Sequence, residues 1–163
     1  MMRPYEPQDL PWVMDVANRA WRPINAAYRA AYGEKLFQRI VPNEHFRKGL
    51  EMEGICRESP DHVFICEENG RRVGFLTVLF DRERKIGEIG NNAVDPDCGL
   101  KGIGQQMYRF ALERFRAEGM EFAKVHTGLD EGHAPARRAY ERAGFDISHS
   151  DITYFMDLAQ RAP

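Results

Sequence analysis

The spacing of apolar residues changes along the chain and divides it into three parts. In the first part, apolar residues recur at helical intervals, which predicts helices over residues 9–21, 25–32, 34–40 and 44–58. Pro23 and Gly33 separate the first three helices, because proline interrupts the helical hydrogen-bond ladder and glycine accepts the dihedrals of a helix end. A short strand is predicted ahead of them at residues 2–5.

The middle part has the apolar runs of strands. These runs predict strands over residues 62–66, 73–80 and 86–94. Asn69-Gly70 joins the first two strands and is typical of hairpin turns in which both central residues adopt positive φ. The three strands therefore form an antiparallel meander, which stops at Asp95-Pro96 because proline cannot continue the ladder of a sheet.

The last part alternates helices with strands. An amphipathic helix is predicted over residues 103–115, and it is followed by a strand over 122–127, a helix over 133–144 and two closing strands over 145–149 and 152–158. A strand, a helix and a further strand in this order form a parallel crossover. We therefore expect an α/β fold with a mixed, mostly antiparallel sheet and helices on its faces.

A glycine-bearing turn joins the strand over residues 86–94 to the helix over 103–115. Gly99, Gly102 and Gly104 allow its backbone to turn tightly and to approach a ligand closely. The helix that follows begins with unpaired N–H groups and the positive end of the helix dipole. These features predict a site for a phosphate or diphosphate at the turn.

Composition limits the classes of function. The 163 residues, 43% of them hydrophobic, suffice for one domain, residues 1–163, with a buried core. A net charge of −2 gives no electrostatic basis for binding nucleic acid. The three scattered cysteines favour a reduced compartment over a disulfide framework. No apolar run suits a membrane helix or a signal peptide, so we expect a cytoplasmic protein without membrane partners.

Two segments carry a resemblance to a known family. The segment G-E-I-G-N-N-A-V-D-P-D-C-G-L-K-G-I-G, followed about 30 residues later by H-A-P-A-R-R-A-Y-E-R-A-G-F, resembles the GNAT superfamily of N-acetyltransferases. The predicted order of elements agrees along nearly the whole chain. The resemblance implies the acyl-CoA N-acyltransferase fold, in which the fourth and fifth strands part and receive the pantetheine arm of acetyl-CoA. It also implies transfer of the acetyl group to an amine, with no metal ion.

The resemblance also implies which residues contact coenzyme A. They come from the strand end, the glycine turn and the start of the later helix, and they are Ala93, Val94, Gly99, Leu100, Lys101, Gly102, Ile103, Gly104, Gln105, His133 and Ala136. Three positions depart from the family pattern. Gly99 stands where glutamine or arginine is usual, Leu100 where glycine is common, and His133 where asparagine is usual. Lys101, Arg137 and Arg138 are candidates for contacts with the CoA phosphates, or for ordinary solvated charges.

Acetyl transfer requires a neutral amine, a base that takes its proton and a donor for the thioester oxygen. Glu88 is the candidate base, because some family members carry a catalytic glutamate at this place, and the N–H of Val94 is the candidate donor. Tyr140 is the candidate acid for the departing thiolate. The alternatives are a surface ion pair for Glu88 and a packed aromatic residue for Tyr140.

Several other residues keep more than one interpretation. His133 is a candidate for contact with pantetheine, for a surface residue at a helix start or for a base, whereas His126 suits a structural role better. Cys98 lacks a positioned base, so a nucleophilic role is disfavoured. The histidines and cysteines do not have the spacing of a zinc site.

The sequence thus predicts an acetyl-CoA-dependent N-acetyltransferase acting on a small-molecule or peptide amine. A non-catalytic acyl-CoA-binding module on the same fold is the alternative, because a fold does not determine an activity. These residues do not distinguish N-acyl transfer from O-acyl transfer, or an acetyl donor from a longer acyl donor. A homodimer is compatible with the resemblance.

Overall fold

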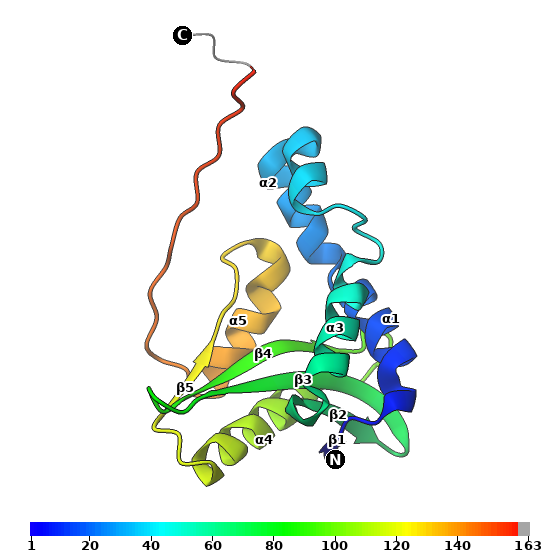
Figure 1. Ribbon diagram of the computed structural model, residues 1–163, viewed down its shortest axis with the longest axis vertical. Helices are drawn as coiled ribbons and strands as arrows, with labels where there is room; N and C mark the ends of the chain where they lie inside the picture. The colour runs from blue at the N-terminus through cyan, green and yellow to red at the C-terminus, as the bar shows by residue number, and fades with distance from the viewer. Residues whose placement is uncertain (160–163) are drawn as a thin grey trace.

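A five-stranded sheet forms the centre of the molecule in the computed structural model, which describes residues 1–159 (Figure 1). Its strands follow one another in chain order across the sheet, and they are β1 (Met2–Pro4), β2 (Val63–Glu68), β3 (Arg71–Asp81), β4 (Ile86–Val94) and β5 (Phe122–Val125). The first four pair antiparallel, and β4 pairs with β5 in parallel. The predicted mixed, mostly antiparallel sheet is confirmed.

Helices cover both faces of this sheet. They are α1 (Leu10–Ala20), α2 (Arg22–Ile40), α3 (Arg47–Glu58), α4 (Ile103–Ala117) and α5 (Ala134–Arg142), with short 3-10 turns η1 (Pro7–Asp9), η2 (Pro60–His62) and η3 (Glu131–His133). Pro23 lies in the first turn of α2, and Gly33 interrupts α2 with a φ of 71°, so both predicted breaks are confirmed. No helix within residues 1–159 is long and apolar enough to cross a membrane.

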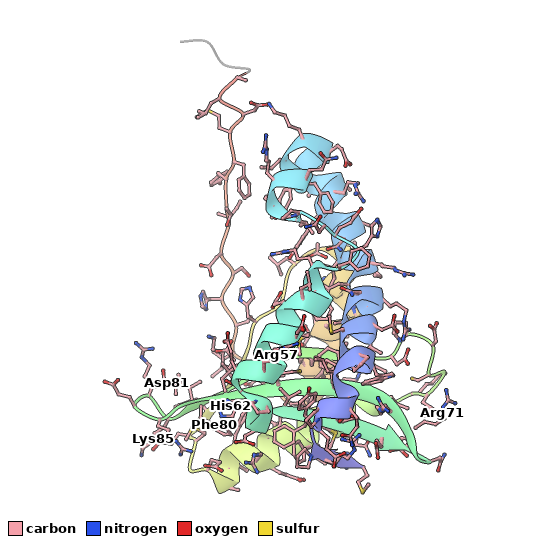
Figure 2. All side chains as sticks on the ribbon, turned by 45° about the vertical axis from the view of Figure 1, so that its right-hand side comes forward. Arg57, His62, Arg71, Phe80, Asp81 and Lys85 are labelled. Atoms are coloured by element: carbon pink, nitrogen blue, oxygen red, sulfur yellow. The ribbon has the colours of Figure 1, made fainter. Side chains whose placement is uncertain are left out.

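The hairpin between β2 and β3 forms at the predicted place. Asn69 and Gly70 both adopt positive φ, 51° and 73°. Figure 2 shows that β3 spans the sheet from Arg71, next to this turn, to Asp81 at the other end, where Lys85 follows in the turn to β4. Helices on both faces of the sheet therefore pack against this long central strand.

The core has two layers, one on each face of the sheet. On one face, α4 and α5 pack on the sheet through a cluster that includes Leu76, Val78, Ile89, Ile103, Met107, Tyr108, Ala111, Phe115 and Tyr140. On the other face, α1 and α3 cover a cluster that includes Val13, Val16, Ala17, Met52, Cys56, Val63, Ile65, Phe75 and Ala93. Phe75 and Leu76 are neighbours in β3 and belong to different layers, because successive side chains of a strand point to opposite faces.

The parallel pairing of β4 with β5 covers only half of β4. It runs from Ile86 opposite Phe122 to Ile89 opposite Val125, whereas β4 continues to Val94. Along residues 90–94, the edge of β4 that faces away from β3 therefore carries no paired strand within residues 1–159. This gap, which we call the β4 gap, is the parting that the family resemblance implied.

The two closing strands predicted over residues 145–149 and 152–158 are not formed, and this prediction was wrong. The segment is extended but unpaired, and only its last residues contact α2 (Figure 1). Its contacts with α2 include the Tyr32 and Phe155 rings, 5.4 Å apart, and a 2.5 Å ion pair from Lys35 to Asp157. Alternating apolar residues favour an extended chain, but a strand also needs a free edge to pair with.

A buried ion pair ties β1 to the start of α1. The Nη1 and Nη2 atoms of Arg3 donate to the carboxylate of Asp9, over 2.7 and 2.8 Å, and the N–H of Glu6 donates to the same carboxylate. The Asp9 side chain is fully buried. Burial by itself raises the pKa of Asp9, but the hydrogen bonds from Arg3 and Glu6 outweigh it, so the pKa lies below its ordinary value.

Asp9→Asn should destabilise the fold, because it removes the buried negative charge that pairs with Arg3 and leaves that guanidinium with one carboxylate partner, Glu67. We expect the free energy of unfolding at pH 7 to fall by roughly 2 to 4 kcal/mol in urea denaturation. Because the folded-state pKa of Asp9 is lowered, this contribution is present at neutral pH and is lost as the pH falls below about 4. The difference between the two proteins should therefore shrink towards pH 3.

Asp15→Asn is the matched control for this substitution. Asp15 lies on α1, pairs with Arg19 and is 61% exposed. Exposed ion pairs contribute little, so this variant should stay within about 0.5 kcal/mol of the original protein. Equal losses in the two variants would contradict a special contribution from Asp9.

Candidate active site

The loop between β4 and α4 is held in place at its first residue, Asp95. The N–H of Asp95 donates to the carbonyl of Val73 in β3, and the Asp95 carboxylate accepts a 2.8 Å hydrogen bond from Arg19 of α1. Burial opposes ionisation of Asp95, but the guanidinium of Arg19 outweighs it and lowers the pKa of this carboxyl. The loop therefore leaves the sheet from a fixed point.

Two glycines shape this loop. Gly99 and Gly102 adopt left-handed backbone, with φ of 68° and 82°, and Gly102 is the residue that caps α4. Leu100 is not among the three non-glycine residues with positive φ, which are Asn43, Asn69 and Lys85. The loop therefore accommodates Leu100, where the family often has glycine, by placing its left-handed turns on either side.

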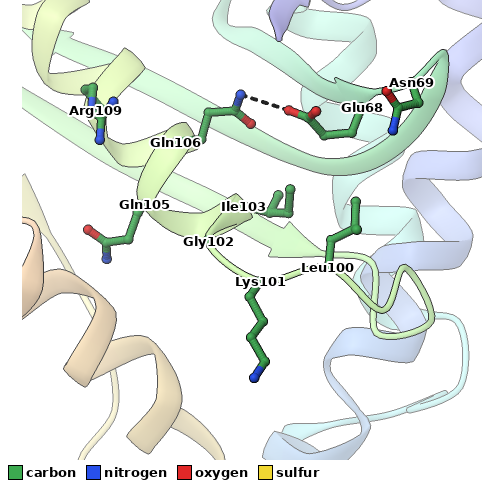
Figure 3. Close-up of a pocket in the computed structure, with 9 residues that line it drawn as sticks. All are labelled: Glu68, Asn69, Leu100, Lys101, Gly102, Ile103, Gln105, Gln106 and Arg109. Carbon is green, nitrogen blue, oxygen red and sulfur yellow. Dashed lines mark hydrogen bonds between the residues drawn. The ribbon is translucent and has the colours of Figure 1, made fainter.

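A pocket of about 550 Å³ opens beside the start of α4 (Figure 3). It is lined by the loop, the first turns of α4 and the β2–β3 turn, that is, by Glu68, Asn69, Leu100, Lys101, Gly102, Ile103, Gln105, Gln106 and Arg109. Gln106 donates a 2.9 Å hydrogen bond to Glu68 across it. Five of the residues assigned to coenzyme A line this pocket, namely Leu100, Lys101, Gly102, Ile103 and Gln105.

The backbone of β4 presents hydrogen-bonding groups to the β4 gap. The N–H of Asp95 donates to the carbonyl of Val73, so these two residues form a hydrogen-bonded pair. Hydrogen-bonded and non-hydrogen-bonded pairs alternate along an antiparallel ladder, so the next pair, Gly74–Val94, is non-hydrogen-bonded. The N–H and C=O of Val94 therefore point away from β3 and into the gap, and by alternation those of Asn92 do so as well. Ala93 lies between them, so its N–H and C=O point to Phe75 of β3, and its side chain lies in the α1 and α3 layer.

The loop after β5 closes the other side of the gap. The Nδ1–H of His133 donates a 2.6 Å hydrogen bond to Asp130, which leaves Nε2 as the other ring nitrogen. Arg137 donates to the carbonyls of Gly128 and Asp130, both over 2.7 Å. Arg137 therefore holds the loop and is half-buried, whereas Arg138, the other arginine considered for the CoA phosphates, is exposed.

One buried polar atom beside the gap has no partner. The Oγ1 of Thr127, two residues beyond the end of β5, is the only buried side-chain nitrogen or oxygen without a hydrogen bond among residues 1–159. Buried hydroxyls are rarely left in this state, because the lost hydration costs free energy. An unpartnered hydroxyl at this place suits a polar ligand in the gap.

Tyr140 lies at the centre of this region. Its ring packs on that of Tyr108 with centroids 4.8 Å apart, and both side chains are buried. The side-chain amide of Asn92 joins the two hydroxyls over 3.0 Å each. Burial raises the pKa of Tyr108 and keeps its hydroxyl protonated.

Glu88 lies near the start of β4, within the part of this strand that pairs with β5. It lies opposite Lys124 of β5, whose Nζ donates a 2.8 Å hydrogen bond to its carboxylate, and it is 31% exposed. The predicted surface ion pair is therefore present, although its partner comes from β5. Ala136 packs at the edge of the α4 and α5 layer, near the start of α5.

Sequence analysis missed several residues of this site. No role was predicted for four residues that hold or face the predicted site residues, namely Asn92, Tyr108, Thr127 and Asp130. The adjacent polar residues Asn91 and Asn92, in a strand whose other polar residue is Glu88, were the available signal. Within residues 1–159, no group of three metal-binding side chains is close enough to hold a metal ion.

Comparison with known proteins identifies the class. The sequence pattern of the acetyltransferase (GNAT) family matches residues 21–145. The mycothiol acetyltransferase of Segniliparus rotundus is 30% identical over 100 residues, which cover 58% of this chain and 37% of that protein. The S-(2-succino)cysteine N-acetyltransferase of Bacillus subtilis is 28% identical over 104 residues, which cover 57% and 63%. The chain thus spans well under half the length of the first of these relatives.

Solved structures agree on the fold. The PaiA N-acetyltransferase of Thermoplasma acidophilum, in complex with coenzyme A, superimposes with a TM-score of 0.66 over 93% of this chain and 92% of that one. Its sequence identity of 16% means that this likeness shows the fold alone. Because the family pattern covers most of the chain, the chain belongs to the acetyltransferase (GNAT) family.

Gly102→Ala should destabilise the free protein, because a left-handed φ of 82° is strained for any residue with a Cβ atom. We expect the free energy of unfolding to fall by about 1 to 2 kcal/mol in urea denaturation. Gly104→Ala is the matched control, since a Cβ there meets Tyr108 no closer than 3.7 Å. Its stability should be unchanged or raised by up to about 1 kcal/mol. Equal effects would show that Gly102 does not shape the loop.

Proposed function

We propose that this chain is an acetyl-CoA-dependent N-acetyltransferase that acetylates a primary amine. The observation that carries the proposal is the course of β4. Its unpaired edge, residues 90–94, leads directly into the glycine loop at the start of α4. One ligand with an amide-containing arm and a diphosphate suits both features at once, and coenzyme A is such a ligand. Membership of the acetyltransferase family supports the same conclusion.

In this proposal coenzyme A takes the place of a missing strand. Its pantetheine amides pair with the backbone groups of Asn92 and Val94, and its diphosphate accepts hydrogen bonds from the N–H groups of the loop and of the first turn of α4. Lys101 belongs to the loop and Arg138 to α5, and both are exposed. Both side chains contact the phosphates in this proposal. The Oγ1 of Thr127 gains a partner from the arm, and so does the Nε2 of His133.

The reaction needs no covalent intermediate on the protein. The amine nitrogen forms a bond to the thioester carbon, the carbonyl electrons move to oxygen, and the N–H of Val94 stabilises this charge. Glu88, directly or through a water molecule, takes the proton from the nitrogen. The carbonyl then re-forms, the C–S bond breaks with its electrons on sulfur, and Tyr140 gives its proton to the sulfur. Exchange of a proton with solvent restores Glu88 and Tyr140.

The acceptor is proposed to be the amine of a small molecule or a peptide. The two relatives are named for small sulfur-containing molecules, which favours the small-molecule class. Aromatic rings of α2 and the C-terminal segment, with Tyr28 near His133 and Tyr32 near Phe155, offer a wall for such an acceptor.

A non-catalytic acyl-CoA-binding module remains the second candidate. The ion pair between Glu88 and Lys124 favours it, because a carboxylate engaged in this way is less available as a base. Binding without turnover would be its signature.

The proposal is tested by binding and turnover together. Coenzyme A at about 100 times its dissociation constant should stabilise the protein by about 2.7 kcal/mol, seen as a rise of several degrees in thermal-shift assays. Tyr140→Phe should keep this shift but lower kcat for acetylation of an amine panel by about 10- to 100-fold. Tyr154→Phe, in the exposed C-terminal segment, is the control. No shift with any acyl-CoA would overturn the proposal, and a shift without turnover would favour the module.

The role of Glu88 has its own test. Glu88→Gln should lower kcat by about 100-fold at neutral pH, and the rate should recover at high pH, where the free amine is abundant without a base. Lys124→Gln removes the ion pair but keeps the carboxylate, so its rate should stay near that of the original protein. An unchanged pH–rate profile in Glu88→Gln would exclude Glu88 as the base.

A further inference from the structure

The side-chain amide of Asn92 joins three groups that differ in what they can accept or donate. Its Nδ2 lies 3.0 Å from the hydroxyl of Tyr140 and 3.1 Å from the carbonyl of Gly90. Its Oδ1 lies 3.0 Å from the hydroxyl of Tyr108. Both tyrosines are almost fully buried, at 4% exposure for Tyr108 and 6% for Tyr140. The amide is therefore surrounded by fixed partners.

These partners determine the direction of every hydrogen bond. A carbonyl can only accept, so the NH₂ group of Asn92 must face Gly90, and its second N–H then donates to the oxygen of Tyr140. The Oδ1 can only accept, so Tyr108 donates its proton to it. The amide uses both of its donors, and Tyr140 acts as an acceptor in this network.

The consequence concerns the proton of Tyr140. Since the Tyr140 oxygen accepts from Asn92, the amide leaves the proton of Tyr140 unused, and the hydroxyl of Tyr108 is the other polar group that interacts with it. The backbone of Asn92 faces the β4 gap, where the thioester is proposed to lie. An N–H on the tyrosine oxygen also stabilises the negative charge that develops there when the proton leaves.

We propose that Asn92 is the positioning residue of the reaction, holding Tyr140 as a proton donor whose O–H is free to reach the sulfur of coenzyme A. This inference rests on the proposed function. As the C–S bond breaks, its electron pair stays on sulfur and takes the Tyr140 proton, while the Asn92 N–H holds the tyrosine oxygen. Tyr108 keeps the amide in this orientation and takes no part in the transfer.

A carboxylate at position 92 would reverse the effect. Asn92→Asp has nearly the same shape but no donor, so it accepts the proton of Tyr140 and turns the hydroxyl away from the sulfur. We expect kcat to fall about tenfold or more, with KM for acetyl-CoA within about twofold, because the backbone that binds the pantetheine arm is unchanged. The matched control is Asn91→Asp, whose side chain contacts Lys48 and Glu51 of α3 and which should keep its kcat.

A double-mutant cycle separates positioning from general damage to the fold. If Asn92 acts through Tyr140, the variant with both Asn92→Asp and Tyr140→Phe should be no slower than Tyr140→Phe alone. Losses that multiply, or an Asn92→Asp variant with undiminished kcat, would overturn the inference. Asn92→Ala replaces Asn92→Asp in the same cycle if the acidic variant does not fold, since it also removes the donor to Tyr140.

A measurement without turnover distinguishes failure of this inference from failure of the proposed function. In proton–nitrogen correlation spectra, the side-chain NH₂ signals of Asn92 are identified as those that Asn92→Asp loses. These signals should shift in both Tyr140→Phe and Tyr108→Phe, because each variant removes one hydrogen-bond partner of the Asn92 amide. Signals that do not move would overturn the inference even in an active enzyme. If the signals shift but the protein does not bind acyl-CoA, the hydrogen bonds of Asn92 with Tyr108 and Tyr140 are present and the proposed function is wrong.

Discussion

The early end of pairing between β4 and β5 is the constraint on which the rest of the site depends. Beyond Ile89, the backbone of β4 has hydrogen-bonding groups that no strand within residues 1–159 satisfies on that side. Unpaired backbone groups in a sheet are costly or serve to bind a ligand. The loop after β5 is fixed against the start of α5, because Arg137 holds its carbonyls and Asp130 holds His133. The gap is thus a built feature of the fold.

The two layers of the core position different parts of the site. The α1 and α3 layer carries Arg19, which fixes the end of β4 through Asp95, and so sets where the glycine loop begins. The α4 and α5 layer carries Tyr108 and Tyr140, which meet over Asn92 of the sheet. The glycine loop therefore follows the end of the unpaired edge, and the tyrosine pair lies over Asn92 in the middle of that edge.

The closing segment shows where sequence patterns stop being informative. Residues 145–158 contain alternating apolar side chains, and strands were expected there. The segment is extended, but Ile147, Tyr154 and Leu158 remain exposed and no pairing forms. Alternation describes one strand by itself, whereas pairing is a property of two chain segments that must meet edge to edge. The sequence holds no information on the second edge.

The sequence by itself determined the local elements and the loop. The Asn69-Gly70 turn, the break at Gly33 and the left-handed turns near Gly102 follow from the intrinsic freedom of glycine and asparagine, which acts within a few residues. Only the tertiary structure decided that Asn92 bridges Tyr108 and Tyr140, that Lys124 pairs with Glu88, and that Thr127 is left unpartnered. These contacts join residues 16 to 48 positions apart, and hydrogen-bond partners at such separations are selected by packing and not by local preference.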